Sequence, residues 1–324
     1  MATPPPKSIL ESRLVIVTGK GGTGKTSVVA ALGLAAARAG RRVLVAETGL
    51  DEAVPRLLAP GTKPVGYAGR ELQPGLTAMR IDPYEALAEY IGLQFGLRTM
   101  TDLVFRNAAF RQLMDASPGW RELITLGKIW HVSQEQDRAG RARFDLVIVD
   151  APATGHGITF LDVPRVAGAA VRAGPLARHA GLVEAMVRNP ETTRLLPVAL
   201  AEELPARETA ELLVRLKERV GIRADRVVVN AVAHSPVPQD VPDLAARLSR
   251  LPADAPLEGL PAPAALAACV RHADSRAALN RHYVDEIARA TGLPIVELPF
   301  LDGGVNGPDD LAVLGAALVP EASS

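Results

Sequence analysis

The stretch Gly19-Lys20-Gly21-Gly22-Thr23-Gly24-Lys25-Thr26-Ser27 decides the fold predicted for this chain. Its glycines let successive backbone N–H groups turn inward around a phosphate, and the helix expected to follow directs its positive dipole end at the same place. Lys25 is placed to reach the β- and γ-phosphates, and the Thr26 hydroxyl is placed to hold Mg²⁺. The stretch therefore predicts a phosphate-binding loop that takes ATP together with Mg²⁺.

The second lysine of this loop, Lys20, lies five places before Lys25. The chain holds six lysines and thirty arginines, and two of the six lysines are in this loop. A compact ammonium fits among crowded phosphate oxygens where a planar guanidinium does not, which favours a functional role for Lys20. The alternative is an ordinary solvated loop charge.

Short apolar runs outside the loop alternate with helical stretches. This order predicts an α/β fold: a doubly wound, mostly parallel sheet with helices on both faces. Strands are expected at residues 14–17, 43–46, 76–81, 144–150, 226–230 and 295–298, and a helix at 27–38. We expect one ATPase domain over residues 13–319, with inserted helical segments at about 83–140 and 160–190. A disordered Pro-rich tail is expected at 1–12 and a second tail at 320–324.

The composition favours an ordinary cytoplasmic enzyme. The 36 basic and 36 acidic residues cancel, so no net charge attracts nucleic acid or an anionic membrane. No apolar run reaches the roughly 18 residues of a spanning helix, so we expect no stable membrane insertion, and the N-terminus lacks the pattern of a signal peptide. The single cysteine, Cys269, excludes an intrachain disulfide and a cysteine metal site.

Asp150 ends the expected strand at 144–150, at the edge where a phosphate loop lies in doubly wound folds. We expect it to hold Mg²⁺ with Thr26, through a water molecule; the alternative is a cap on the following turn. The stretch Ala151-Pro152-Ala153-Thr154-Gly155-His156-Gly157 is then expected to form a nucleotide-sensing loop, in which Gly155 and Gly157 absorb backbone changes when the γ-phosphate leaves.

The chain resembles the ArsA family of P-loop ATPases, which belongs to the SIMIBI class and includes arsenite-pump ATPases and ATPases that target tail-anchored membrane proteins. Lys20 to Ser27 matches the deviant Walker A motif, and Asp150 to His156 is similar to the switch II signature. Four further features occur in the same order along the chain as in members of the family: Ile81-Asp82-Pro83, Pro118-Gly119 through Lys128, a helix start at Glu208-Thr209, and Val229-Asn230. The resemblance identifies the chain as a bacterial single-unit member.

The resemblance implies an ATP-dependent dimer, either a homodimer or a heterodimer with a homologous ATPase. In such a dimer Lys20 reaches the partner's phosphates, with the logic of an arginine finger. It also implies that Asn230 contacts the adenine edge. The loop formed by Pro299, Phe300 and Leu301 is implied to wrap over the adenine.

Two departures from the family pattern limit this comparison. The switch I Asp of the family falls on Gly49, so Glu47 or Asp51 is expected to replace it unless both are ordinary exposed carboxylates. Slow hydrolysis is one expected consequence, because phosphoryl transfer depends mainly on positioning and charge neutralisation. The chain also lacks the Cys-x-x-Cys pair of many eukaryotic targeting ATPases and the cysteines that arsenite favours, so an arsenite-efflux subunit is a weaker hypothesis.

The leading functional hypothesis is a switch that couples nucleotide state to a protein client, for instance a hydrophobic membrane segment. The helical segments 83–132 and 162–189 lie where targeting ATPases of the family build a client groove. Residues 167–171 and 182–187 are apolar enough to line such a groove, although such stripes are more often core, and only Met100, Met114 and Met186 fall in the two segments. The alternative is a slow or non-hydrolysing regulatory subunit paired with a homologous ATPase. Action on DNA or on a surface is disfavoured by the zero net charge.

Overall fold

A computed structural model describes residues 8–95, 119–170, 173–235, 237, 241, 243–253, 255, 257 and 259–320. Several sequence expectations lie outside these residues: most of the N-terminal tail, residues 321–324, Met100, Met114, Pro118 and Val171. Of Thr154, Gly155 and His156, only the backbone is described.

The structure confirms the predicted α/β fold. Its eight-stranded sheet has the order β3-β4-β2-β5-β1-β6-β7-β8, and every pairing is parallel except that of β3 with β4. The strands are β1 Leu14–Gly19, β2 Val43–Glu47, β3 Arg70–Gln73, β4 Leu76–Arg80, β5 Leu146–Asp150, β6 Thr193–Leu200, β7 Val227–Val232 and β8 Ile295–Pro299.

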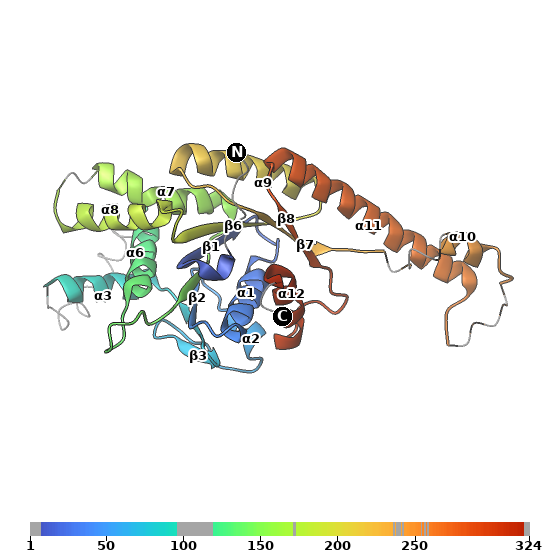
Figure 1. Cartoon of the computed structure of the whole chain (residues 1–324), viewed down its shortest axis with the longest axis horizontal. Helices are drawn as coiled ribbons and strands as arrows, with labels where there is room; N and C mark the ends of the chain where they lie inside the picture. The colour runs from blue at the N-terminus through green and yellow to red at the C-terminus, as the bar shows by residue number, and fades with distance from the viewer. Residues whose placement is uncertain are drawn as a thin grey trace.

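Helices cover both faces of this sheet (Figure 1). In chain order they are α1 Lys25–Arg38, α2 Val54–Leu58, α3 Pro83–Phe95, α6 Trp120–Gln134, α7 Thr154–Ala170, α8 Pro175–Arg188, α9 Glu203–Arg215, α10 Leu244–Ser249, α11 Pro263–Thr291 and α12 Pro308–Leu318, with a 3₁₀ turn at Ile9–Glu11 and a π turn at Leu216–Val220. Helices α1 and α12 pack together on one face, and α6, α7 and α8 form a layer on the other. The first half of α11 extends away from the sheet, with α10 beside it.

The central strands are buried on both faces, which explains their continuous apolar sequences. In β1, Val15 and Val17 pack in the cluster that contains α1, whereas Leu14 and Ile16 pack in the cluster that contains α6 and α7. This alternation follows from the two-residue period of a strand. Both helical layers are thus fixed to the strand that leads into the phosphate loop.

The sequence prediction missed the edge strand β3 and also β6. Strand β6 lies between β1 and β7 although it contains Pro197, a residue that normally argues against a central strand. The regular pairing of β6 with β7 begins at Val198, directly after the proline. The strand therefore tolerates the missing N–H of Pro197.

Four boundaries also differ from expectation. Ile9 is buried in a short turn, so order begins before residue 12. The helical stretch expected over 83–140 ends at Gln134, and a turn follows in which Gln136 pairs with Ala142. Helix α9 begins at Glu203, so the helix start expected at Glu208 is wrong. Helix α7 begins at Thr154, so residues 154–157 form its first turn and not a loop.

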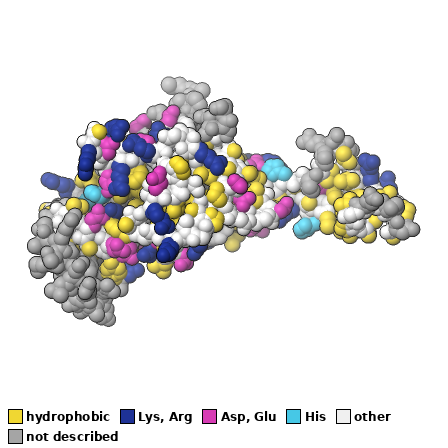
Figure 2. Space-filling model, turned by 90° about the horizontal axis from the view of Figure 1, so that it is seen from below, with side chains coloured by type: hydrophobic (Ala, Val, Ile, Leu, Met, Phe, Trp, Pro, Cys, Tyr) yellow, Lys and Arg dark blue, Asp and Glu magenta, His cyan; other side chains and the backbone are white. Residues whose placement is uncertain are grey.

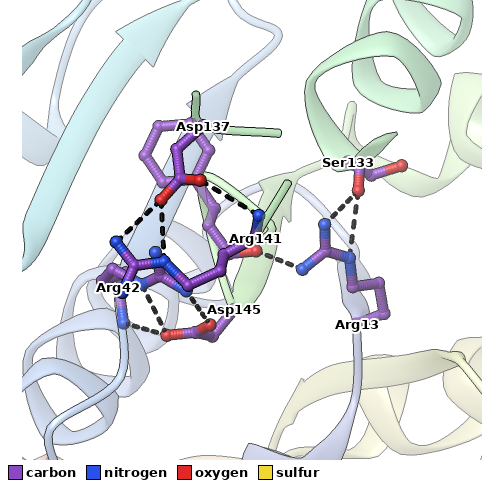
Figure 3. Close-up of polar contacts among 7 residues, drawn as sticks. Arg13, Arg42, Ser133, Asp137, Arg141 and Asp145 are labelled. Atoms are coloured by element: carbon purple, nitrogen blue, oxygen red, sulfur yellow. Dashed lines mark hydrogen bonds and ion pairs between the residues drawn. The ribbon is translucent and has the colours of Figure 1, made fainter. Parts of the chain in front are cut away.

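Polar contacts fasten the amino ends of β1, β2 and β5, opposite the phosphate loop (Figure 3). Asp145, just before β5, accepts bonds from the Arg42 backbone N at 2.9 Å and from Arg42 Nη2 at 2.6 Å. Arg13, just before β1, donates from Nε to the Ser133 carbonyl at 3.0 Å and also donates to the Phe144 carbonyl. Hydrogen bonding from Arg42 lowers the pKa of Asp145 to about 2.

We expect Asp145→Asn to lower the free energy of unfolding at pH 7 by about 1–2 kcal/mol, less than the full pKa shift implies because Arg42 is partly exposed. A carboxylate whose folded-state pKa is depressed contributes stability above its unfolded pKa and loses it as pH falls through the folded value. The difference between wild type and variant should therefore shrink by roughly half at pH 3. Urea unfolding of wild type and variant at pH 7 and pH 3 measures this difference in the free energy of unfolding. An equal loss from exposed Asp285→Asn would contradict the prediction.

Candidate active site

The phosphate loop joins the end of β1 to the start of α1, as the sequence predicts. Gly22 and Gly24 have φ of 82°, a left-handed conformation that glycine adopts without strain. A Cβ on Gly19 would lie 2.2 Å from the Val198 carbonyl oxygen, and one on Gly24 would lie 2.2 Å from Asn230 Nδ2. By contrast, a Cβ on Gly21 or Gly22 would meet nothing within 4 Å, so the outer side of the loop has open space. Such a cradle fits a phosphate group.

Lys25 stands in the first turn of α1, and its Nζ donates to the Lys20 carbonyl oxygen at 2.9 Å. Burial lowers the pKa of Lys25. The Thr23 hydroxyl donates to the same carbonyl at 3.0 Å. Within the described ranges no carboxylate forms a salt bridge with Lys25, although the charge of Asp150 attracts its ammonium, so the hydrogen bond that an arriving phosphate replaces is one to a neutral carbonyl.

The structure brings Thr26 and Asp150 together, although 124 residues separate them. Thr26 Oγ1 donates to Asp150 Oδ2 at 2.6 Å, and Thr48 Oγ1 donates to the Asp150 carbonyl at 2.7 Å. Burial raises the pKa of Asp150. A hydroxyl and a carboxylate beside a phosphate cradle form a donor set that suits Mg²⁺, which prefers oxygen ligands and keeps several waters. Both residues therefore fit the metal-binding role predicted for them.

Lys20 forms an ion pair that the sequence did not predict. Its Nζ lies 2.5 Å from Glu208 Oε1, and the lysine side chain remains half exposed. Glu208 is in the middle of α9, 188 residues away along the chain. No sequence spacing indicates such a contact, because it depends on how α9 packs beside the loop.

Glu47 is the last residue of β2 and is aligned with Asp150, the last residue of β5. It is buried, with 2 % of its surface exposed. Its Oε1 accepts bonds from the backbone N of Ala53 at 2.8 Å and of Val54 at 2.9 Å, at the start of α2. Its Oε2 is buried with no hydrogen-bond partner, and burial raises the Glu47 pKa to about 7.

The other two switch I positions face solvent. Asp51 and Gly49 are both exposed, and a Cβ on Gly49 would come no closer than 3.9 Å to another residue. The structure thus separates the two carboxylates considered as replacements for the family's Asp. Glu47 is buried at the edge that carries Asp150, whereas Asp51 lies at the surface.

The residues expected around the adenine lie at the ends of β7 and β8. Asn230 Nδ2 donates to the Thr23 carbonyl at 3.0 Å, so this side chain supports the phosphate loop. Phe300 donates its backbone N–H to the Val232 carbonyl at 2.9 Å, and the Arg276 guanidinium lies 4.1 Å from the centre of the Phe300 ring. Pro299 and Leu301 flank it and are partly buried. The contacts predicted between these residues and adenine stay predictions.

The part of the chain that the structure describes contains no cluster of three or more His, Cys, Asp or Glu arranged to hold a metal. Cys269 is exposed on α11. None of the helices in the described ranges is long and apolar enough to cross a membrane. On the face shown in Figure 2, basic and acidic side chains are interspersed, as expected from the zero net charge.

Comparison with known proteins agrees with this geometry. The model of the family described as anion-transporting ATPase, ArsA, matches residues 12–180. The ATPase BagA of Mycobacterium tuberculosis is 30% identical over 317 residues, which cover 93% of this chain and 91% of BagA. An arsenical pump-driving ATPase of Escherichia coli is 30% identical over 239 residues, covering 66% of this chain and 38% of that protein. With its P-loop fold and these matches, the chain belongs to the ArsA family and is an ATPase.

Proposed function

We propose that this ATPase is a Mg²⁺-dependent molecular switch, in which two subunits face each other across their nucleotides and the nucleotide state controls binding of a protein client. The observation that carries the proposal is the convergence of the glycine cradle with the bond of 2.6 Å between Thr26 and Asp150. Lys25 neutralises the β- and γ-phosphates when it leaves the Lys20 carbonyl, and Thr26 and Asp150 hold Mg²⁺.

Lys20 acts on the partner's phosphates in this proposal. In a single chain it is held by Glu208, but half of its side chain is exposed and the loop around it is open. An exposed ion pair contributes at most about 1 kcal/mol, so a partner's triphosphate outcompetes Glu208 readily. The Glu208 contact then keeps Lys20 in place until the second subunit arrives.

We expect Lys20→Ala to lower ATP turnover at least about 100-fold while leaving affinity for a fluorescent ATP analogue nearly unchanged, because a cation supplied in trans stabilises mainly the transition state. Steady-state phosphate release and equilibrium binding measure the two effects. Normal turnover in Lys20→Ala would contradict the proposed role of Lys20. A parallel loss of binding would place Lys20 in its own subunit's phosphate site.

Glu208→Gln tests the resting contact of Lys20. It removes the competing charge, so we expect turnover at limiting enzyme concentration to rise by up to about fivefold, the scale of an exposed ion pair. The matched control is Glu211→Gln on the same helix, whose carboxylate pairs with Arg207 and Arg215. Equal effects of the two variants would show that Glu208 acts only through the general charge of α9.

Glu47 is proposed as the carboxylate that orients the attacking water. Its free Oε2 lies at the edge that carries Asp150, and a pKa of about 7 suits a general base at neutral pH. Its other oxygen binds the N-terminus of α2, which connects the water-orienting group to the segment between β2 and α2. Asp51 is too exposed to hold a water in a fixed place.

We expect Glu47→Gln to be more stable than wild type at pH 8 and to hydrolyse ATP more slowly. Because the folded-state pKa of about 7 exceeds the ordinary 4.5, wild-type stability is fully present below pH 4.5 and falls as pH rises through 7. Glutamine cannot ionise, so the variant should gain about 1–3 kcal/mol at pH 8 and little at pH 5. Chemical unfolding at pH 5 and pH 8 measures the stability difference, and steady-state phosphate release measures the rate of hydrolysis. Lower activity in Asp51→Asn but not in Glu47→Gln would assign the role to Asp51.

The proposed link to a client runs through α7. This helix begins at Thr154, four residues after Asp150, and packs against α6 and α8. A Cβ on Gly157 would lie 3.2 Å from both the Pro152 carbonyl oxygen and Thr18 Oγ1, so the first turn of α7 packs closely on β1. A shift at Asp150 on loss of the γ-phosphate is therefore transmitted to the helical layer within a few residues.

A second candidate function is a regulatory subunit that binds ATP, barely hydrolyses it alone and pairs with a homologous ATPase. The observation that favours it is Gly49, which is exposed and has room for a side chain it lacks. Turnover of the purified chain separates the two candidates. Turnover that appears only after co-purification with a related chain supports the regulatory subunit, and turnover by the chain alone supports the first proposal.

A further inference from the structure

A cavity of about 580 Å³ lies within the helical layer, between α3, α6 and α8. It is remote from the phosphate loop in sequence, and none of the residues predicted to bind ATP or Mg²⁺ lines it, whereas Leu182 belongs to the stretch 182–187 predicted for a client groove. Its volume falls in the range of about 300–1,000 Å³ that is typical of sites for small molecules. Leu93, Ile124 and Leu182 contribute apolar walls, and Leu93 and Leu182 are 59% and 42% exposed at its surface.

Three rings pack against one another in one wall of the cavity, tilted or edge to face. His179 of α8 lies with its ring centre 5.0 Å from that of Tyr90 on α3 and 5.3 Å from that of Trp130 on α6. A Cβ on Gly127 would lie 2.7 Å from His179 Nε2, so only glycine allows the imidazole to approach α6 this closely. Burial lowers the pKa of His179, so the ring is neutral at pH 7 and adds no charge to the wall.

The acidic group of the cavity is already neutralised. Glu89 Oε2 lies 2.7 Å from Lys128 Nζ and also accepts a bond from the Tyr67 hydroxyl. Lys128 is largely buried and stands 4.8 Å from the centre of the Tyr67 ring. His131 Nε2 is 3.9 Å from Glu89 Oε1. Glu89 therefore has no unsatisfied charge with which to attract a cationic ligand.

Apart from the paired Glu89 and Lys128, the cavity is lined by one further charged side chain that is described, the guanidinium of Arg178. Arg178 is exposed and precedes His179 on α8. Among the residues that the structure describes, no carboxylate pairs with its guanidinium, whereas Arg188 on the same helix pairs with Glu184 at 2.9 Å. A guanidinium presents a planar fork of donors that matches a carboxylate.

We propose that this cavity binds an amphipathic anion: the apolar chain lies along the ring wall and Leu182, and the carboxylate pairs with Arg178. The charges select the anion over a neutral or cationic amphiphile, because Glu89 is neutralised and Arg178 is not. This site is separate from the ATP site, and its occupancy does not depend on hydrolysis.

Isothermal titration of the whole chain with decanoate, decanol and decylamine, without nucleotide and below micelle concentrations, tests the proposal. Trp130 lines the cavity, so fluorescence of a Trp120→Phe variant, which retains Trp130 alone, gives an independent readout. We expect decanoate to bind more tightly than decanol, decylamine to bind least, and Trp130 emission to change at lower concentrations of decanoate than of decanol.

Arg178→Gln should weaken decanoate binding about tenfold, the scale of a hydrogen-bonded charge partly screened by water, and leave decanol binding unchanged. Arg188→Gln is the matched control on the same helix and should leave both unchanged. Leu182→Asp should abolish decanoate binding. The proposal is overturned if decanoate fails to bind, if decylamine binds as tightly, or if Arg178→Gln and Arg188→Gln act alike. Because no nucleotide is present, none of these results depends on the proposed ATP switch.

Discussion

The close approach of the phosphate loop to the ends of β6 and β7 is the constraint on which the site depends. Gly19 touches the Val198 carbonyl and Gly24 touches the Asn230 amide, at distances that leave no room for a Cβ. The loop is therefore held between two strands that follow it by more than 170 residues in the chain. This packing restricts the loop backbone before any nucleotide arrives, which reduces the entropy lost on binding.

The same sheet edge concentrates carboxylates at an energetic cost. Parallel pairing aligns Glu47, which is buried, with Asp150, which is partly buried, and desolvation raises the pKa of both. A buried carboxylate oxygen without a partner, such as Glu47 Oε2, destabilises a fold unless a ligand or water satisfies it. Groups kept in such surroundings are characteristic of functional sites. The helical layer concentrates a second set of titratable groups around its own cavity, away from this edge.

The central strands and the phosphate loop could be predicted because their sequences carry strong local signals. Runs such as Leu14 to Val17 are buried on both faces, and the spacing of glycines and lysines in the loop is tied to its chemistry. Strand β6 was missed because Pro197 contradicts the local pattern, and its position is set by pairing with β1. The first turn of α7 was predicted to be a loop because Gly155 and Gly157 suggest flexibility. In the structure, Gly157 is instead the small residue that lets this turn pack closely on β1.

The sequence by itself determined the fold class, the family and the position of the phosphate loop, since each follows from short motifs whose residues lie close together in the chain. Only the tertiary structure decided which carboxylate stands beside Asp150, that Lys20 rests on Glu208, and that Asn230 supports the loop. It alone also formed the cavity between α3, α6 and α8. The physical reason is the same in each case: these contacts join residues that only the packing of helices and strands brings within hydrogen-bonding or van der Waals distance.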